Sequence, residues 1–281
     1  MSRVFVGLAA LVVLAAPVLA AEEMILVYPG KPGTQTQAKS VLEAFTDYVE
    51  AKAGWGKGAL HATYYNEEAG ALQALGADNP PAWGILSLAI YLKWKKAGKP
   101  IELVAQSELD KKPTMQFHLL VPKESKIQNL GGLDGANVAS SFLDDRQFAT
   151  NIVFGGKVNA QKSIAIIDTK SISTALTASA RFKALKDGRR VDALVVDDEQ
   201  LRGLEGKDDF KKMRLVWSSD PLPTPVVVRF GTPNVTQQSK LLGVLTDMPG
   251  NAQGRKILEE MTTTGFREPN KGAYLALEKA Y

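Results

Sequence analysis

The chain has 281 residues, a mass of 30.3 kDa and a formal net charge of +4. An apolar content of 45% is enough for a substantial core, and the length suggests about two domains. Charged residues of mixed sign make up 23%, which excludes a disordered chain and gives no nucleic-acid-binding footprint. Because cysteine is absent, the sequence excludes disulfides, thiolate zinc sites, iron–sulfur clusters and a cysteine nucleophile.

Residues 1–20 have the layout of a secretory signal peptide. Arg3 supplies a positive start, an apolar run covers 4–16, and small or neutral residues lead up to Ala20. The alternative is an uncleaved membrane anchor, because 4–21 reaches the lower length limit of a spanning helix. We expect cleavage near Ala20 and a mature protein in the periplasm, where a cysteine-free chain depends on its core for stability.

The first part of the mature chain alternates short apolar runs with helical patterns. Strands are predicted over 24–28, 61–65, 83–88, 101–105 and 116–121. Apolar residues between Val41 and Val49 share one helical face, and Gly54 ends that helix. Another helix follows the third strand and ends near Lys96.

A second set of elements follows the same scheme. Strands are predicted over 136–140, 163–168, 191–196, 213–217 and 226–230. Helices are predicted over 171–186, 239–247, 252–263 and 272–280. This alternation predicts an α/β fold with mainly parallel sheets covered by helices on both faces. In such sheets ligands bind at the carboxyl ends of the strands.

Motifs for catalysis, metals and cofactors are missing. His61 and His118 lie in strand-like segments without a second ligand at metal spacing, so we expect structural roles for both. No Gly-x-Ser-x-Gly elbow, phosphate loop or dinucleotide fingerprint is present. The sequence therefore predicts no catalytic residue, no metal and no cofactor.

Polar residues instead follow the predicted strands. The predicted ligand-binding residues are Tyr28, Thr34, Gln35, Ser87, Ser140, Ser141, Lys170, Ser171 and Asp197. Hydroxyls, free helix N–H groups and one lysine suit an anion, whereas Asp197 favours an ammonium group. For each hydroxyl the alternative is a simple helix cap.

Several segments in a fixed order carry a family resemblance. They are 126–139 (KIQNLGGLDGANVA), Thr174–Leu176, 187–197 (DGRRVDALVVD), 215–225 with its three prolines, and Gly254–Leu258 before Gly265 and Phe266. In this order, residues 24–281 resemble the periplasmic substrate-binding proteins of ABC importers, of the phosphate, phosphite and phosphonate type.

The resemblance implies the two-lobe, type II periplasmic binding protein fold. One lobe would comprise 21–112 and 226–281, and the other 113–225. Crossover strands would lie near 112–121 and 219–228, with ligand held between lobes that close by a hinge motion. The predicted site residues from Tyr28 to Asp197 would face this cleft.

The chain departs from its relatives after Ser140 and Ser141. Phosphonate-binding members carry a Ser/Thr-rich loop that ends in glycine at a helix start, whereas here Asp144 and Asp145 follow and the glycine is missing. A carboxylate at this point is expected to cap the helix itself and to compete with an anionic ligand.

The sequence therefore predicts a non-enzymatic, monomeric solute-binding protein. It would capture a small anionic or zwitterionic ligand, phosphonate- or phosphate-like, and deliver it to the transmembrane subunits of an ABC permease, with no nucleic-acid partner. Two alternatives stay open. One is a binding subunit that serves a sensor, and the other is an enzyme on the same fold with Asp197 or Lys170 as the reactive group.

Overall fold

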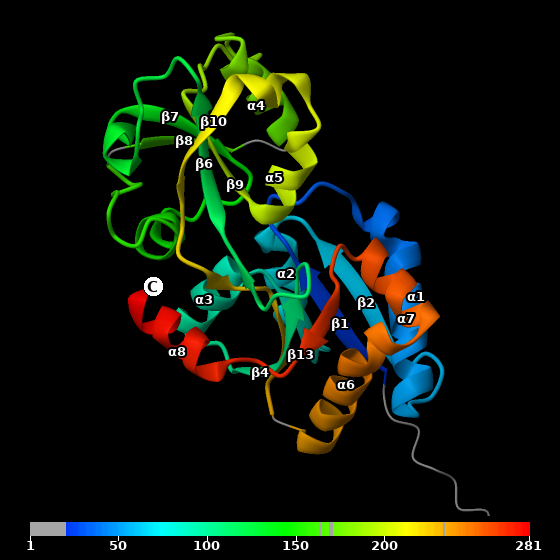
Figure 1. Cartoon of the computed structure of the whole chain (residues 1–281). Coiled ribbons are helices and arrows are strands. Elements are labelled where there is room, and N and C mark those ends of the chain that lie inside the picture. Colours follow the sequence, from blue (N-terminus) through cyan, green and yellow to red (C-terminus); the bar gives the residue numbers. More distant parts are fainter. Residues whose placement is uncertain (1–20, 163, 169–170, 233) are drawn as a thin grey trace, which may run out of the picture.

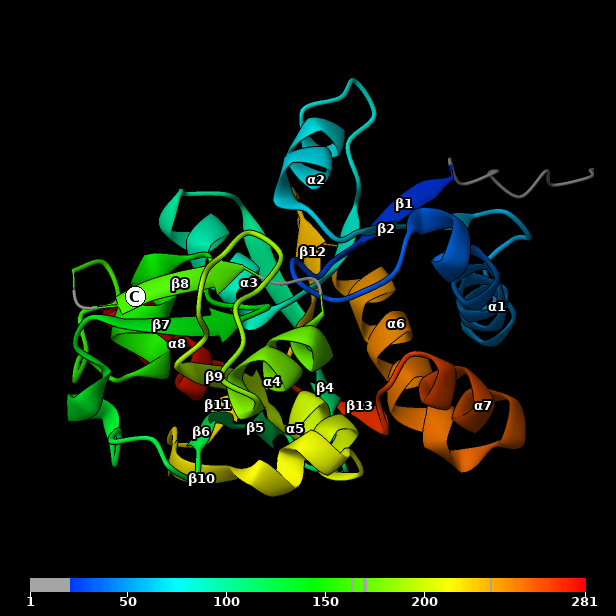
Figure 2. The ribbon, with the colours of Figure 1, turned by 90° about the horizontal axis from the view of Figure 1, so that it is seen from above.

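Two β-sheets, each covered by helices, form two bodies that lie one above the other in Figure 1 and are viewed from above in Figure 2. The computed structural model describes residues 21–162, 164–168, 171–232 and 234–281. The predicted signal peptide lies outside these ranges. None of the helices in the described ranges combines the length and apolar character that crossing a membrane requires.

The first body, the lower one in Figure 1, contains a six-stranded sheet of order β13-β4-β12-β3-β1-β2. Its strands are β1 Glu22–Val27, β2 Leu60–Tyr65, β3 Trp83–Leu86, β4 Ile101–Glu108, β12 Val226–Phe230 and β13 Gly265–Arg267. Its helices are α1 Gln35–Ala53, α2 Glu68–Leu75, α3 Leu88–Lys96, α6 Val235–Asp247, α7 Ala252–Glu260 and α8 Lys271–Ala280, with a short 3₁₀ turn at Met248–Gly250.

The second body contains a five-stranded sheet of order β10-β6-β9-β7-β8. Its strands are β6 Phe117–Pro122, β7 Ala136–Ser140, β8 Ile164–Asp168, β9 Ala193–Asp197 and β10 Met213–Ser218. Its helices are α4 Ile172–Ala180, α5 Asp198–Glu205 and the π-helical segment η2 Phe148–Val153, with 3₁₀ turns at Leu130–Leu133 and Asp208–Lys212.

Both sheets are mixed, whereas mainly parallel sheets were expected. In the first, β1 pairs in parallel with β2 and β3, but β12 is antiparallel to β3 and β4. In the second, β7 is parallel to β8 and β9, but β6 is antiparallel to β9 and β10. The cause is the path of the chain, because a strand that returns to its sheet from the other body runs opposite to its neighbours.

The chain passes between the two sheets twice, between β4 and β6 and between β10 and β12. These two passages pair with each other through β5 Thr114–Met115 and β11 Leu222–Pro223, which form a short antiparallel ribbon. The Thr224 N–H donates to the Pro113 carbonyl at 3.2 Å. The ribbon lies where crossover strands were predicted, and the lobe boundaries at 112/113 and 225/226 stay predictions.

Local sequence explains how individual helices begin and end. Thr34 and Gln37 form a reciprocal capping box at the start of α1, and Gly54, with φ +67°, ends it. The helix predicted over 171–186 stops at Ala180, because Phe182 adopts φ +52° and the chain turns back toward Arg190. The short elements α2, η2, α5 and β13 were not predicted from the sequence.

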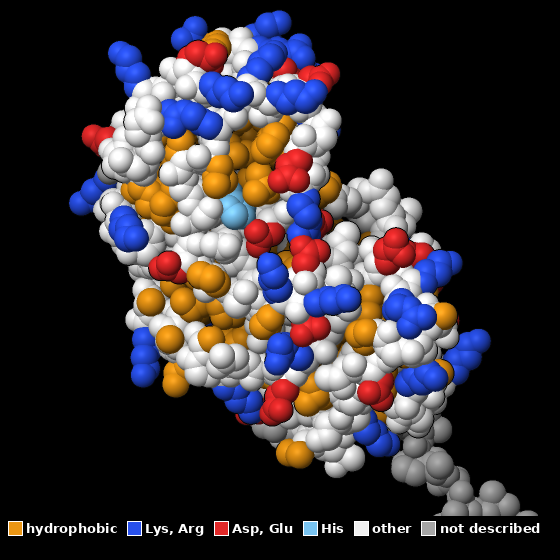
Figure 3. All heavy atoms as spheres, in the orientation of Figure 1, with side chains coloured by type: hydrophobic (Ala, Val, Ile, Leu, Met, Phe, Trp, Pro, Cys, Tyr) orange, Lys and Arg blue, Asp and Glu red, His pale blue; other side chains and the backbone are white. Residues whose placement is uncertain are grey.

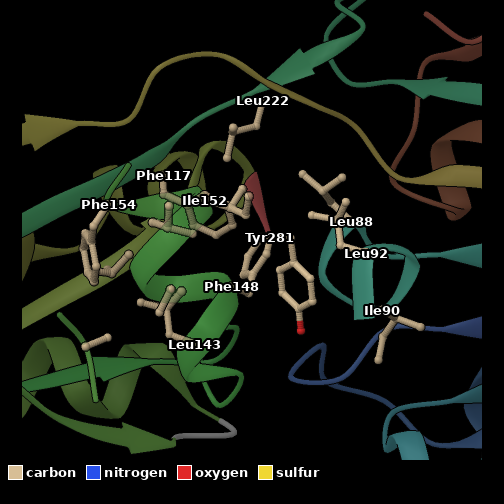
Figure 4. Packing of buried hydrophobic residues seen from close by; sticks show 14 of the residues in the cluster. Leu88, Ile90, Leu92, Phe117, Leu143, Phe148, Ile152, Phe154, Leu222 and Tyr281 are labelled. Carbon is tan, nitrogen blue, oxygen red and sulfur yellow. The ribbon is translucent and has the colours of Figure 1, made fainter. Parts of the chain in front are cut away.

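Buried side chains form three clusters. One lies within the first body, around Phe45 and Trp83, and one lies within the second, around Leu176 and Leu194. The third spans both bodies. Figure 4 shows part of it, with Tyr281 between residues of α3, such as Leu88, and residues of η2, such as Phe148. The two bodies therefore share a continuous apolar contact beside the ribbon.

Candidate functional site

A cavity of about 470 Å³ lies between the two bodies, a volume typical of small-molecule sites. The ends of β1, β3 and β9, the starts of α1 and α3, and the loop after β7 all contribute to its walls. Much of the lining is apolar or aromatic, including Tyr28, Tyr64, Leu88, Phe117, Phe142 and Phe148. The cavity can thus enclose a small solute with a few polar groups and an apolar part.

Four of the predicted site residues line this cavity, namely Tyr28, Thr34, Ser87 and Asp197. Gln35 is the exposed first residue of α1, and Ser171 is an exposed cap of α4, so neither lies on the cavity wall. Ser140 and Ser141 are buried at the end of β7, one residue before the lining begins at Phe142. Lys170 lies outside the described residues. Contact with ligand stays a prediction for all of them.

The first-body wall combines a phenol with a helix start. Burial, followed by the charge of Glu199, raises the pKa of Tyr28 well above its usual value, so this side chain stays a neutral hydrogen-bonding group. Ser87 caps α3 by accepting from the Ile90 N–H at 3.4 Å. Leu88 and Ala89, which open α3, also line the cavity. First-turn N–H groups lack partners within their helix and carry partial positive charge, which favours a negative group at this wall.

The second-body wall contributes a carboxylate. Asp197 ends β9 and caps α5, where its Oδ1 accepts from the Gln200 N–H at 2.8 Å. Burial, assisted by the neighbouring Glu199 and opposed by that hydrogen bond, raises the pKa of Asp197 to about 6. A carboxylate in such a place binds a cation well, because a cation offsets the cost of burying its charge.

Lys31 joins the two bodies at the cavity. Its Nζ lies 2.8 Å from Glu199 Oε2 of α5 and donates to Thr262 Oγ1 at 3.1 Å. It also lies 5.4 Å from the ring centroid of Tyr28. The sequence analysis named neither Lys31 nor Glu199 as a site residue. The only available signal was that each is close in sequence to a predicted site residue.

The loop after β1 approaches the second body very closely at Gly30. This glycine has φ +84°, and a Cβ built on it would lie 1.5 Å from the Ser141 carbonyl oxygen. A side chain at this position would therefore collide with the backbone of the opposite body. Ser141 thus contributes a backbone contact between the bodies, while its side chain stays off the cavity wall.

Acidic side chains outnumber basic ones around the cavity. The described lining contains Glu68, Asp144, Asp145, Asp197, Glu199 and Glu260 against Lys31 and Lys93. Both lysines have acidic partners, since Lys93 Nζ lies 2.6 Å from Glu68 Oε2. Figure 3 shows charges of both signs close together at the junction of the two bodies.

The expectation that a carboxylate caps the helix after β7 is confirmed at Asp145. Its Oδ1 accepts from the N–H groups of Gln147 and Phe148 at 2.9 and 3.0 Å. Its Oδ2 accepts from the Tyr281 hydroxyl at 2.5 Å. Asn151 Nδ2 donates to the Tyr281 main-chain oxygen at 3.1 Å, which connects α8 to η2 a second time.

Neither histidine lines the cavity. His118 lies in β6, where Nε2 is 2.8 Å from Asp198 Oδ1 and Nδ1 is 2.8 Å from Ser218 Oγ. These bonds join β6, β10 and α5 near the ribbon. Within the described ranges, no three acidic or histidine side chains come together in a way that could hold a metal ion.

Comparisons with known proteins agree with this geometry. A family model described as "ABC transporter, phosphonate, periplasmic substrate-binding protein" matches residues 33–274. The chain belongs to this family. No curated protein matches the sequence.

Several solved structures have the same fold. A binding-protein component of an ABC phosphonate transporter from Pseudomonas aeruginosa is 17% identical, with a TM-score of 0.68 over 93% of this chain and 85% of that one. PhnD1 from Prochlorococcus marinus, solved with methylphosphonate, is 12% identical, with a TM-score of 0.65 over 92% and 97%. XAC2383 from Xanthomonas citri, solved with chloride, is 13% identical, with a TM-score of 0.71 over 92% and 96%.

At these identities the likeness concerns the fold alone. Together with the family match, it identifies the two bodies as the lobes of a periplasmic substrate-binding protein, and we call them the first and the second lobe from here on. The cavity therefore lies between the two lobes.

Proposed function

We propose that this protein captures a small zwitterionic or anionic solute between its lobes and presents it to an ABC permease. The observation that carries the proposal is the cavity, which is enclosed by strand ends and helix starts of both lobes in a chain that belongs to a substrate-binding family. Both lobes contribute polar groups to one space, as capture by lobe closure requires.

The charges of the two walls support a zwitterion with a phosphonate- or phosphate-like group. The N–H groups that open α3 favour the anionic group at the first lobe, next to Ser87 and Tyr28. Asp197 favours an amine at the second lobe. Aminoalkyl phosphonates and amino acids combine these two features.

The partners follow from membership of the family. We propose a monomer that meets the transmembrane subunits of a permease, binds no nucleic acid and performs no catalysis. Two alternatives remain. Neighbouring permease genes would separate transport from a sensor-linked subunit, and turnover of a bound solute would reveal an enzyme acting through Asp197 or Lys170.

A calorimetric panel tests the ligand class. The wild-type protein is titrated with 2-aminoethylphosphonate, methylphosphonate, phosphate, an alkanesulfonate, amino acids and neutral sugars. We expect one solute per chain, with tightest binding for a zwitterion. Binding of neutral sugars alone would contradict the proposal.

Export is proposed from the sequence of residues 1–20. The mature chain should begin at Ala21 or Glu22. Intact-mass measurement of the periplasmic fraction checks this start, and a chain that retains Met1 in the membrane fraction would contradict it.

A further inference from the structure

Asp145 lies on the cavity wall of the second lobe, in a position that depends on two separate elements. Its Oδ1 accepts hydrogen bonds from the N–H groups of Gln147 and Phe148, at the start of η2. Tyr281, at the end of α8, donates to the other carboxylate oxygen. Tyr281 is itself only 7% exposed and has Lys96 Nζ 5.2 Å from its ring centroid. The carboxylate is therefore held from both sides.

Asp145 takes the N–H groups of Gln147 and Phe148, two donors that an anion at the loop after β7 could otherwise use. The Ser140 side chain is 1% exposed and is not part of the cavity lining, and its oxygen accepts from the Phe142 N–H at 3.2 Å. Lys93, which lines the cavity from α3 of the first lobe, is paired with Glu68 at 2.6 Å. A ligand anion placed beside Asp145 would meet its negative charge, while the two N–H groups at the start of η2 already bond to that carboxylate.

We propose that Asp145 is a specificity residue that excludes anionic groups from the second-lobe wall and so fixes the direction in which the ligand binds. The inference rests on the proposed function and names the residue that enforces its orientation, with the anionic group toward α3 and the rest of the solute toward the second lobe. Purely anionic solutes such as inorganic phosphate then bind poorly, because one unit of negative charge faces them from within the protein.

The test is Asp145→Asn titrated with inorganic phosphate and with methylphosphonate. Asparagine keeps an oxygen for the two N–H groups, and the Tyr281 hydroxyl can turn to accept from its amide. Loss of the charge should strengthen phosphate binding by about tenfold or more. Asp145→Ser, also a good helix cap, repeats the test in a second variant, and melting curves confirm that both are folded.

Asp144→Asn is the matched control. It removes the same charge from the neighbouring residue, whose side chain is exposed. A gain for Asp145→Asn well above the gain for Asp144→Asn supports the proposal. Equal gains, or no gain in either Asp145 variant, overturn it. Failure of this inference can be told apart from failure of the proposed function. The proposed function fails if the wild-type protein binds neutral sugars alone.

Discussion

Asp197 has a structural role as a helix cap, and the proposed function gives the same carboxylate a second role in binding the amine of the ligand. It caps α5, faces the cavity and has a pKa raised to about 6 by burial. Charged neighbours are Glu199 and Asp198, which raise this pKa, and Lys31, which lowers it. Its charge therefore changes within the pH range in which periplasmic proteins work.

Affinity for an amine should follow the charge of Asp197. Below pH 6 the carboxyl becomes protonated, so a ligand ammonium loses its partner. Between pH 7 and pH 5 the affinity for 2-aminoethylphosphonate, relative to methylphosphonate, should fall by about tenfold. The same ratio measured for Asp197→Asn corrects for the titration of the two phosphonate groups themselves. Calorimetry at both pH values measures it.

Asp197→Asn provides the matched comparison, because asparagine caps α5 equally well. The variant should bind 2-aminoethylphosphonate weakly at both pH values and leave the affinity for methylphosphonate unchanged.

The stability of the wild-type protein should change with pH in the opposite direction to its affinity for the amine. A raised pKa in the folded state lowers stability as pH rises from about 4 through 6, so Asp197→Asn should melt higher than wild type at pH 7.5 and not at pH 4. An unchanged affinity ratio in wild type would mean that Asp197 does not bind the amine.

Gly30 shows how one residue controls the approach of the lobes. Because a Cβ would meet the Ser141 carbonyl at 1.5 Å, Gly30→Ala should prevent full closure and weaken solute binding at least about tenfold. Gly135→Ala is the control, since Gly135 also has positive φ but has open space around its Cβ position. Equal losses in the two variants would assign the effect to backbone strain.

At the scale of elements, α8 connects the two lobes. Tyr274 on α8 donates to the Thr224 carbonyl beside the ribbon at 2.7 Å, and Tyr281 reaches Asp145 of the second lobe. The end of this helix is thus part of the contact between the lobes.

Tyr281→Phe removes the hydroxyl that donates to Asp145 and keeps the ring. Since the acceptor is charged, we expect a loss of about 1 to 3 kcal/mol in the free energy of unfolding, measured by urea titration. Tyr48→Phe is the control, because the Tyr48 hydroxyl bonds only within the first lobe, to Asn251. A Tyr281 variant as stable as wild type would show that this bond contributes nothing.

Elements with a strong apolar pattern were predictable from the sequence. The buried runs of β3 and β9 and the apolar face of α1 appear where expected. Their burial requires apolar side chains at regular spacing, and this spacing is visible in the sequence. Short elements such as α5 and β13 could not be predicted, since they depend on contacts with distant strands. Strand direction was also hidden, because it follows from the crossing of the chain between the lobes.

The site was predictable only in part. Tyr28, Ser87 and Asp197 follow strands at the edge where ligands bind, and the structure brings them to one cavity. Ser140 and Ser141 follow a strand too, but their hydroxyls are buried beside it. The pairing of Lys31 with Glu199, 168 positions apart, has no signal in a single sequence.

At the scale of the whole molecule, the described structure is a closed one. Lys31 bonds to Glu199, Gly30 contacts Ser141, and one apolar cluster runs through both lobes. These contacts join parts that a hinge at the ribbon would separate. Solute bound at about 100 times its dissociation constant should add about 2.7 kcal/mol to the free energy of unfolding.

Small-angle scattering with and without a solute that calorimetry has shown to bind tests the central claim most directly. Capture between the lobes predicts a radius of gyration that falls on saturation to the value calculated for the closed structure. The free protein should have the larger radius, and Gly30→Ala should stay near it even with solute bound. A radius that is unchanged in wild type at full occupancy would contradict capture by closure of the two lobes.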